Sequence, residues 1–388
     1  MKRVAFIFQY DEGWLGGLNY FRNLISAIDG LHNPEIEAVI FVSSETQEKH
    51  LAGLSNTKII RSRLLRNTPI FKYISRLFWV FTSRDILMER LLRKHRIDVI
   101  SHSGSLGRGS KLPSIGWIPD FQYYYLPEFY QGDEVSQRIA ANKAMCKRFS
   151  VILLSSHDAQ KDMQKFIPEF AGKSRVLQFV ANEIFDDSRT GKEELQAKYG
   201  FKGNYFLVCN QFWAHKNHRV IIEALHELRK TGREMLVLAT GNTQDHRQPG
   251  FFNALMEYAK ELNVEDCFKV LGIVPRTDLM GLKHGALALI NPSLFEGWNS
   301  SVEEAKSLGK RIILSDLEVH REQNPKAALF FAAKDTQGLA SAMWETYANF
   351  DPELDREMMI KAQLLLPQRL QDFAGTYQKI VLDLAHAG

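Results

Sequence analysis

Short apolar runs alternate with helix-length amphipathic segments along almost the whole chain. Strands buried on both faces of a sheet are near-continuous apolar runs, and their alternation with helices is typical of a doubly wound α/β fold. The runs form two similar sets. The predicted strands are residues 4–8, 38–42, 98–101, 114–118, 151–155 and 175–179 in the first set, and 205–209, 235–240, 268–271, 286–290, 311–314 and 328–331 in the second.

The two sets of strands are separated by residues 182–200, where polar residues replace apolar ones. We therefore expect two Rossmann-like domains, at residues 1–185 and 200–366, facing each other across a ligand cleft. A last helix-like stretch covers residues 367–388.

Composition narrows the class of protein. The chain has 388 residues, of which 45% are hydrophobic and 24% charged, and its net charge of +4 does not imply a nucleic-acid partner. Cys146, Cys209 and Cys267 lie far apart and offer no zinc or disulfide framework, which fits a reducing compartment. The amino-terminal apolar run is too short for a signal peptide, and no run reaches the roughly 18 apolar residues of a membrane span. We expect a cytoplasmic protein.

Residues 58–96 carry an unusual excess of positive charge. They hold eleven Lys and Arg but only two acids, Asp85 and Glu89, so their formal charge is +9 and that of the rest of the chain is −5. Residues 70–81 mix aromatic and basic side chains, a composition suited to an anionic membrane surface. The alternative is a core helix with a solvated basic face. We expect membrane contact, with the protein peripheral on the inner face of the membrane.

Residues 286–315 predict a strand, a loop, a helix and a second strand, with Gly297 in the loop and Gly309 ending the helix. Asn299, Ser300 and Ser301 are all favourable N-caps. The free backbone N–H groups and the positive dipole end of such a helix suit a phosphate.

Two carboxylates flank this helix start, with seven residues between them. Glu296 in the loop is placed to bind sugar hydroxyls, and Glu304 in the first helical turns is placed to bind a ribose. The structural alternative is a capping box, in which Ser301 caps the helix and Glu304 reaches back to it.

The wider string strengthens the ligand-binding interpretation. Ser293-Leu-Phe-Glu-Gly-Trp298, Glu304-Ala305, Gly309-Lys310 and Ser315-Asp316 together resemble the donor-binding motif of the family 4 glycosyltransferases, which have the GT-B fold. The resemblance implies an acceptor-side domain at 1–185, a nucleotide-sugar donor domain at 200–366, and a final helix, 367–388, that packs back on the first domain. It also implies that Glu296 is catalytic and that the donor contacts Gly297, Trp298, Asn299, Ser300, Ser301 and Glu304.

A second part of the resemblance lies in Cys209–Arg219. Many family members have an Arg and a Lys there, both on the donor diphosphate. Lys216 matches the Lys and is expected to be catalytic, but Asn210 and Gln211 stand where the Arg would be and are expected to contact the donor. Either one cation of the pair is missing, or Arg219 or His215 replaces it.

The remaining matches are loops that follow strands. Leu271–Arg276 resembles the base-binding loop of the family, where backbone groups of Ile273 and Val274 meet the nucleobase. Gly16 and Gly17 match a Gly pair that faces the donor diphosphate and acceptor, although a Gly pair alone is usually only a turn. They do not form the Gly-x-Gly-x-x-Gly fingerprint of NAD sites.

The string at residues 116–130 resembles a subgroup of family 4 enzymes in bacterial polysaccharide assembly. Many family members have a His in this loop beside the donor sugar, whereas the nearest candidates here are Asp120, Gln122 and Tyr123. Asp120 follows a predicted strand and is expected to be catalytic. Its structural alternative is to cap the next turn.

These features predict a retaining glycosyltransferase that moves a sugar from a UDP- or GDP-sugar to a glycan or lipid-linked acceptor in cell-surface polysaccharide synthesis. The sequence contains no Asp-x-Asp, the metal-binding element of the other common glycosyltransferase fold, so we expect no metal ion and no cofactor. Lys216 and the N–H groups around Ser300 and Ser301 are expected to stabilise the leaving phosphate instead. The alternatives are a sugar-nucleotide epimerase or phosphorylase on a similar fold, and a non-catalytic glycan- or nucleotide-binding homologue.

Overall fold

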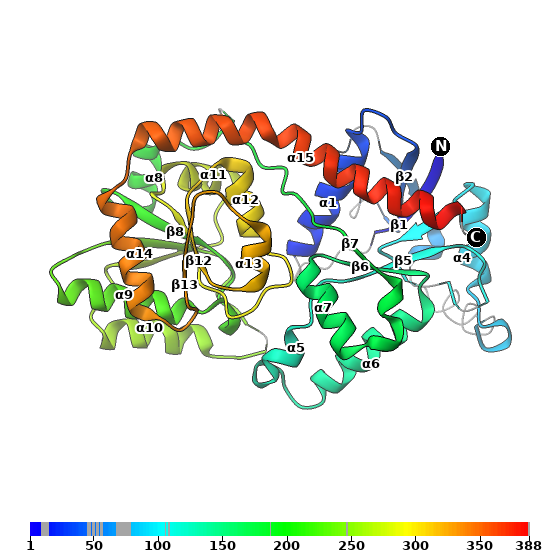
Figure 1. Ribbon diagram of the computed structural model, residues 1–388, viewed down its shortest axis with the longest axis horizontal. Helices are drawn as coiled ribbons and strands as arrows, with labels where there is room; N and C mark the ends of the chain where they lie inside the picture. Colours follow the sequence, from blue (N-terminus) through cyan, green and yellow to red (C-terminus); the bar gives the residue numbers. More distant parts are fainter. Residues whose placement is uncertain are drawn as a thin grey trace. The chain divides into compact units, whose positions relative to one another are not determined.

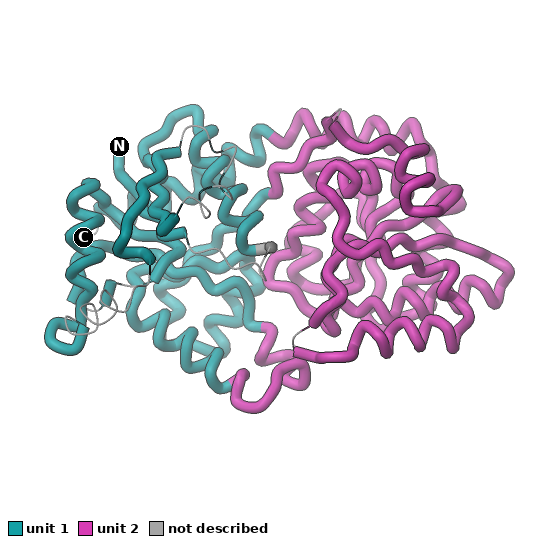
Figure 2. Tube along the Cα trace, turned by 180° about the vertical axis from the view of Figure 1, so that it is seen from behind, with its two compact units in different colours: residues 1–121, 136–180, 367–388 teal, residues 122–135, 181–366 magenta. Residues whose placement is uncertain are grey.

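In the computed structural model the chain forms two parallel β-sheets with helices packed on them (Figure 1). The structure describes residues 1–8, 15–44, 48, 51, 54, 57–66, 79–104, 106–107, 109–186, 188–245 and 247–386. The chain divides into two compact units, coloured separately in Figure 2. Unit 1 contains residues 1–121, 136–180 and 367–388, and unit 2 contains residues 122–135 and 181–366.

The described part of unit 1 has a seven-stranded sheet in the order β3-β2-β1-β4-β5-β6-β7, in which every pairing is parallel. The apolar runs become its buried strands, and β6 is buried at every position. The strands are β1 (Lys2–Ile7), β2 (Ile36–Val42), β3 (Lys58–Arg61), β4 (Val99–Ser101), β5 (Ser114–Ile118), β6 (Val151–Leu154) and β7 (Ser174–Val176).

Helices cover both faces of this sheet because successive side chains of a strand point to opposite faces. Ala5 belongs to a buried cluster with Leu92 of α4, whereas the neighbouring Phe6 contacts the rings of Phe21 on α1 and Tyr377 on α15. The helices of unit 1 are α1 (Leu15–Asp29), η1 (Arg63–Arg66), α4 (Ile86–Lys94), most of α6 (Glu134–Arg148), α7 (His157–Phe166), η3 (Pro168–Lys173) and the second half of α15 (Pro352–His386).

The last helix is longer than the sequence indicates. Pro367, where the sequence suggests that it begins, lies inside α15. Residues 367–388 group with unit 1, where Gln371 and Gln378 accept hydrogen bonds from the backbone N–H groups of His32 and Glu35 at 3.1 and 2.8 Å.

The described part of unit 2 has a six-stranded parallel sheet in the order β10-β9-β8-β11-β12-β13. Tyr205–Cys209, the first of these strands in the chain, lies between β9 and β11 and is buried along almost its whole length. The strands are β8 (Tyr205–Cys209), β9 (Leu236–Thr240), β10 (Phe268–Gly272), β11 (Leu289–Asn291), β12 (Ile312–Ser315) and β13 (Ala328–Phe331).

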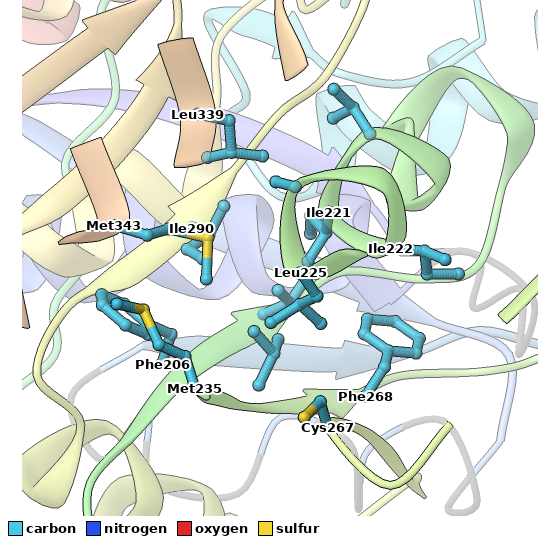
Figure 3. Packing of buried hydrophobic residues seen from close by; sticks show 14 of the residues in the cluster. Phe206, Ile221, Ile222, Leu225, Met235, Cys267, Phe268, Ile290, Leu339 and Met343 are labelled. Atoms are coloured by element: carbon cyan, nitrogen blue, oxygen red, sulfur yellow. The ribbon is translucent and has the colours of Figure 1, made fainter. Parts of the chain in front are cut away.

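Unit 2 also buries both faces of its sheet. On one face, Ile221 and Leu225 of α9 pack with Phe206, Ile290 and, from α14, Leu339 (Figure 3). On the other face a second buried cluster joins the sheet to α8, α11 and α12. The helices of unit 2 are α5 (Gln122–Tyr125), η2 (Pro127–Phe129), α8 (Lys192–Tyr199), η4 (Ala214–Lys216), α9 (His218–Lys230), α10 (Phe251–Glu261), α11 (Arg276–Gly285), α12 (Ser300–Leu308), α13 (Glu318–Gln323), α14 (Thr336–Ala348) and the first half of α15.

The predicted fold class, two Rossmann-like halves with parallel sheets, is confirmed. One strand was missed, because β3 has the sequence Lys-Ile-Ile-Arg, lies at the edge of its sheet and is exposed at both ends. The unit boundaries also differ from the expected ones at residues 122–135, which the sequence places in the first domain and which group with unit 2.

The basic stretch at residues 58–96 does not form one amphipathic helix. Its described parts include β3, η1 and α4, and residues 67–78 lie outside the described ranges. None of the helices in the described ranges combines the length and the apolar content that crossing a membrane requires.

Candidate active site

The site is organised around the place where the strand order of the unit 2 sheet reverses. From β8 the chain passes to β9 and β10 on one side, and then to β11 on the other side of β8. In open parallel sheets, ligands bind outside the carboxyl ends of the strands at such a switch point. The loops that follow β8 and β11 therefore begin side by side.

Direct hydrogen bonds join these two loops. The backbone N–H of Leu294, after β11, donates to the carbonyl oxygen of His215, after β8, at 2.8 Å. Asn217 has a left-handed backbone with φ of 56°, and its side-chain amide donates to the carbonyl oxygens of Pro292 at 3.1 Å and Ala333 at 2.8 Å. Asn217 thereby fixes the position of the preceding residue, Lys216.

Lys216 and Glu296 meet at this point. The Lys216 Nζ lies 2.6 Å from Glu296 Oε1, and only 16% and 10% of the two side chains are exposed. The Ser293 hydroxyl donates to the same carboxylate oxygen at 2.6 Å. Two residues that are 80 positions apart, both expected to be catalytic, thus form one half-buried charged pair.

The helix start beside this pair is capped by Asn299. Its Oδ1 accepts a hydrogen bond from the backbone N–H of Ser301 at 3.0 Å, whereas Ser300 is exposed and Ser301 is buried. The capping-box alternative is wrong, because Ser301 is not the cap and the Glu304 carboxylate instead accepts from Lys283 Nζ at 2.7 Å. The helix ends, as predicted, at a left-handed Gly309.

A buried polar network supports Asn299. Its amide Nδ2 lies 2.9 Å from His320 Nε2, and the His320 Nδ1 lies 2.7 Å from the carbonyl oxygen of Ser315. These partners require a neutral ring with the proton on Nδ1, and burial lowers the pKa of His320 accordingly. Gln323 bonds both the N–H and the carbonyl of Asn299 at 3.2 and 3.0 Å.

Asn210, which replaces the expected Arg, belongs to the same network. Its Oδ1 accepts from Ser301 Oγ at 3.2 Å and from Asn291 Nδ2 at 3.4 Å. Its own Nδ2 is buried and has no hydrogen-bond partner among the described residues. Gln211 is half-buried beside it. Gly241 allows β9 to end here, because a Cβ at this position would lie 2.2 Å from the Asn210 carbonyl oxygen.

The two sequence alternatives for a second cation, Arg219 and His215, differ in their surroundings. Arg219 pairs with Glu223 at 2.9 Å and stacks on the Tyr258 ring at 4.0 Å. His215 is buried, and burial, helped by the charges of Lys216 and Arg247, lowers its pKa well below the ordinary range, so the ring is neutral.

Arg247, which the sequence did not single out, lies behind this loop. Its guanidinium donates to His215 Nδ1 at 3.3 Å, pairs with Asp245 at 3.3 Å and lies over the Trp213 ring at 4.8 Å. It also donates to the side-chain oxygen of Gln122 at 3.3 Å. Arg247 is 8% exposed, and these contacts tie it to the loop that precedes Lys216.

The other predicted donor contacts of unit 2 lie in the loops after β10 and β11. Ile273 follows β10 and is 72% exposed, which is unusual for a large apolar side chain, whereas Val274 packs against the core. Gly297 and Trp298 are half-buried in the loop after Glu296, and the Lys306 ammonium lies 6.0 Å from the centre of the Trp298 ring.

Three predicted site residues, Gly16, Gly17 and Asp120, belong to unit 1. Gly16 and Gly17 lie in the first turn of α1, after β1, rather than in a turn before the helix. Asp120 is half-buried and follows β5. All three come after the carboxyl ends of strands of one parallel sheet, the edge where ligands bind.

A family model matches the segment that contains the charged pair. Residues 191–363 match the family model for glycosyl transferases group 1. The chain is 24% identical over 314 residues to the O-antigen chain mannosyltransferase RfbU of Salmonella typhimurium, covering 80% of this chain and 81% of that protein.

Two solved structures share the fold along nearly the whole chain. Anabaena Alr3699/HepE in complex with UDP-glucose has a TM-score of 0.67 at 14% identity, and the match covers 100% of both chains. WaaG, a glycosyltransferase involved in lipopolysaccharide biosynthesis, has a TM-score of 0.55 at 15% identity, with 99% of this chain and 98% of that chain covered. Residues 191–363, the segment that matches the group 1 model, hold both members of the Lys216–Glu296 pair, and the chain shares the GT-B fold of these two solved structures.

Proposed function

We propose that the protein transfers a sugar from a nucleotide-sugar donor to a glycan or lipid-linked acceptor in cell-surface polysaccharide synthesis, with retention of the anomeric configuration and without a metal ion. The observation that carries the proposal is the Lys216–Glu296 pair, which puts a cation and a carboxylate at the switch point of the unit 2 sheet. The names of RfbU and WaaG support the pathway class, and the HepE complex supports a UDP-sugar, with a GDP-sugar as the other candidate.

In the proposed reaction an acceptor hydroxyl attacks the anomeric carbon while the bond from that carbon to the diphosphate oxygen breaks. The departing diphosphate takes up the hydroxyl proton on the same face. Negative charge grows on the diphosphate, so fixed positive charge and N–H donors stabilise the transition state. Lys216, the Asn210 Nδ2 that has no partner among the described residues, and the N–H groups at the start of α12 next to the capped Ser301 are donors of this kind.

Donor binding breaks the Lys216–Glu296 pair in this mechanism. The Lys216 ammonium turns to the diphosphate, and the Glu296 carboxylate accepts hydrogen bonds from sugar hydroxyls. Glu304 binds the ribose, and the backbone at Ile273 and Val274 meets the base. In unit 1, Gly16 and Gly17 are assigned to the diphosphate and acceptor, and Asp120 to the reacting sugar.

The proposal places the enzyme peripherally on the inner face of the membrane, where a lipid-linked acceptor is presented. Two apolar side chains in the basic stretch support this placement, because Val80 is 69% and Phe81 is 82% exposed. Arg93, in the same stretch, is also mostly exposed. Exposed apolar groups among cations suit an anionic surface.

A donor and acceptor screen tests the proposal. The purified protein is incubated with UDP- and GDP-sugars, each with and without a polyprenyl-linked acceptor sugar. Transfer that needs both substrates, with an anomeric configuration retained in the product by NMR, supports the proposal. An isomerised nucleotide sugar or a free sugar phosphate formed without acceptor would identify the epimerase or phosphorylase alternative. Nucleotide binding without turnover would identify a non-catalytic homologue.

A further inference from the structure

A buried lysine lies between two carboxylates next to the proposed donor site. Lys283, on α11, is 1% exposed. Its Nζ lies 2.7 Å from Glu304 Oε2 and 3.7 Å from Glu183 Oε2. Lysine is almost never fully buried unless it is paired. Burial disfavours its charge, but Glu304 and Glu183 outweigh that effect and raise the pKa of Lys283.

The two carboxylates are held differently. Glu183 Oε1 accepts from Arg276 at 3.0 Å, and its Oε2 is buried with no hydrogen-bond partner in the described part of the chain. Glu304 accepts from Lys283 through Oε2, and within the same ranges its Oε1 makes no hydrogen bond. The Glu304 side chain is 19% exposed, so one oxygen is occupied and the carboxylate still reaches solvent.

This arrangement orients the carboxylate. A charge-assisted hydrogen bond to a buried, rigidly packed ammonium fixes one oxygen of Glu304, which sets the direction of the other. The oxygens of a carboxylate accept hydrogen bonds from hydroxyl groups. Neighbouring hydroxyls of a ribose are suitable donors for such an oxygen.

We propose that Lys283 is a positioning residue for ribose recognition, holding Glu304 Oε2 so that Oε1 accepts a hydrogen bond from a ribose hydroxyl of the nucleotide donor. The inference rests on the proposed function, because it requires a nucleotide ligand. It assigns to Lys283 a part in specificity in addition to its part in the buried charge cluster.

The ratio of affinities for ribose and deoxyribose nucleotides tests this inference. Isothermal titration calorimetry of the full chain measures the dissociation constants of UDP and GDP and of their 2′-deoxy and 3′-deoxy counterparts. For the nucleotide that wild type binds, the ribose form should bind at least ~10-fold tighter than one deoxy form, the size of a charged hydrogen bond. In Lys283→Met this ratio should fall below ~3-fold, whereas Lys283→Arg should keep it.

The ratio separates the positioning role from a structural one, because a general loosening of unit 2 weakens both nucleotides alike. Glu183→Gln is the matched control, since it changes the cluster but keeps the Lys283–Glu304 bond, and it should keep the ratio. Where Lys283→Met does not fold, the double variant Lys283→Met/Glu183→Gln leaves one buried carboxylate instead of two and should show the same fall.

Two results would count against the inference in different ways. An unchanged ribose preference in the folded Lys283 variants overturns it and leaves the proposed function intact. Failure of wild type to bind any of these nucleotides overturns the proposed function itself, and the inference with it.

Discussion

The buried His218 predicts how the stability of unit 2 changes as the pH falls. It is the first residue of α9, is fully buried and stacks on Phe212 with 4.3 Å between ring centres and 13° between ring planes. Neither ring nitrogen has a hydrogen-bond partner among the described residues. Burial, followed by repulsion from Lys216, lowers the pKa of His218 from 6.5 to about 3.

The sign of the effect follows from proton uptake. The folded state keeps His218 neutral down to about pH 3, whereas the unfolded chain takes up the proton near pH 6.5. The unfolded state therefore binds more protons between these values, and the contribution of His218 to stability is complete above pH ~6.5 and is lost as the pH falls toward ~3. At pH ~5 the loss is about 2 kcal/mol relative to pH ~8.

His218→Phe removes this titration and keeps the ring stack on Phe212. It also removes a buried, unpaired N–H, which costs about 1–3 kcal/mol, so the variant should be at least as stable as wild type at pH ~8. At pH ~5 its advantage should grow by about 2 kcal/mol.

The assay is urea unfolding at both pH values, with hydrogen exchange of α9 peptides as the readout, so that the free energy refers to unit 2. The exposed His32 in unit 1 provides a control, since His32→Phe should leave that free energy unchanged at both pH values. An advantage of His218→Phe that is equal at pH 8 and pH 5 would refute the assigned pKa and the burial of an unpaired ring.

Three further predictions concern the site, the membrane and the core. Glu296→Gln should lower kcat at least ~100-fold while Tm changes little, because the amide keeps the shape of a loop side chain, and turnover of the wild-type protein should survive EDTA. Wild-type turnover in the variant would contradict the mechanism, as would a loss of wild-type turnover in EDTA that magnesium restores. Phe81→Glu should weaken binding to anionic vesicles in co-sedimentation but not activity on a soluble acceptor analogue, and wild type that ignores such vesicles at low salt would remove the membrane role. Lys310→Met should lower the free energy of unfolding of unit 2 by about 3–5 kcal/mol in urea, because it leaves Asp355 buried without its 2.7 Å partner. Adding Asp355→Leu to this variant should restore much of the lost stability. A small loss in the single variant would show that water already reaches the pair.

The sequence predicted the fold well because a strand that is buried on both faces of a sheet is a continuous apolar run. A run such as Leu287–Ile290 has no polar position, and its parallel neighbours have the same character. β3 has no such apolar run, because an edge strand with charged ends needs few apolar residues. The family resemblance assigned both Lys216 and Glu296 to the donor site, and each follows a strand of the same parallel sheet.

The supporting residues of the site were not predictable in the same way. Arg247, Lys283 and His320 are polar residues with no local pattern, and each is buried against a partner between 5 and 32 positions away. Their partners become neighbours only when the loops and helices assemble. The sequence offered three equally good caps for α12, and it was the position of His320 and Gln323 around Asn299 that selected one.

The polar groups beneath α12 also explain why the helix start is a good place for a ligand. Burying Asn299, Ser301 and His320 costs free energy unless every donor and acceptor is paired, and the network pairs them with one another and with the backbone. The exception is Asn210 Nδ2, which is buried at the end of β8, next to the Lys216 loop, without a partner in the part of the chain that the structure describes. In a network that is otherwise satisfied, an unpaired donor at the switch point of a sheet is best explained as a contact that the ligand completes.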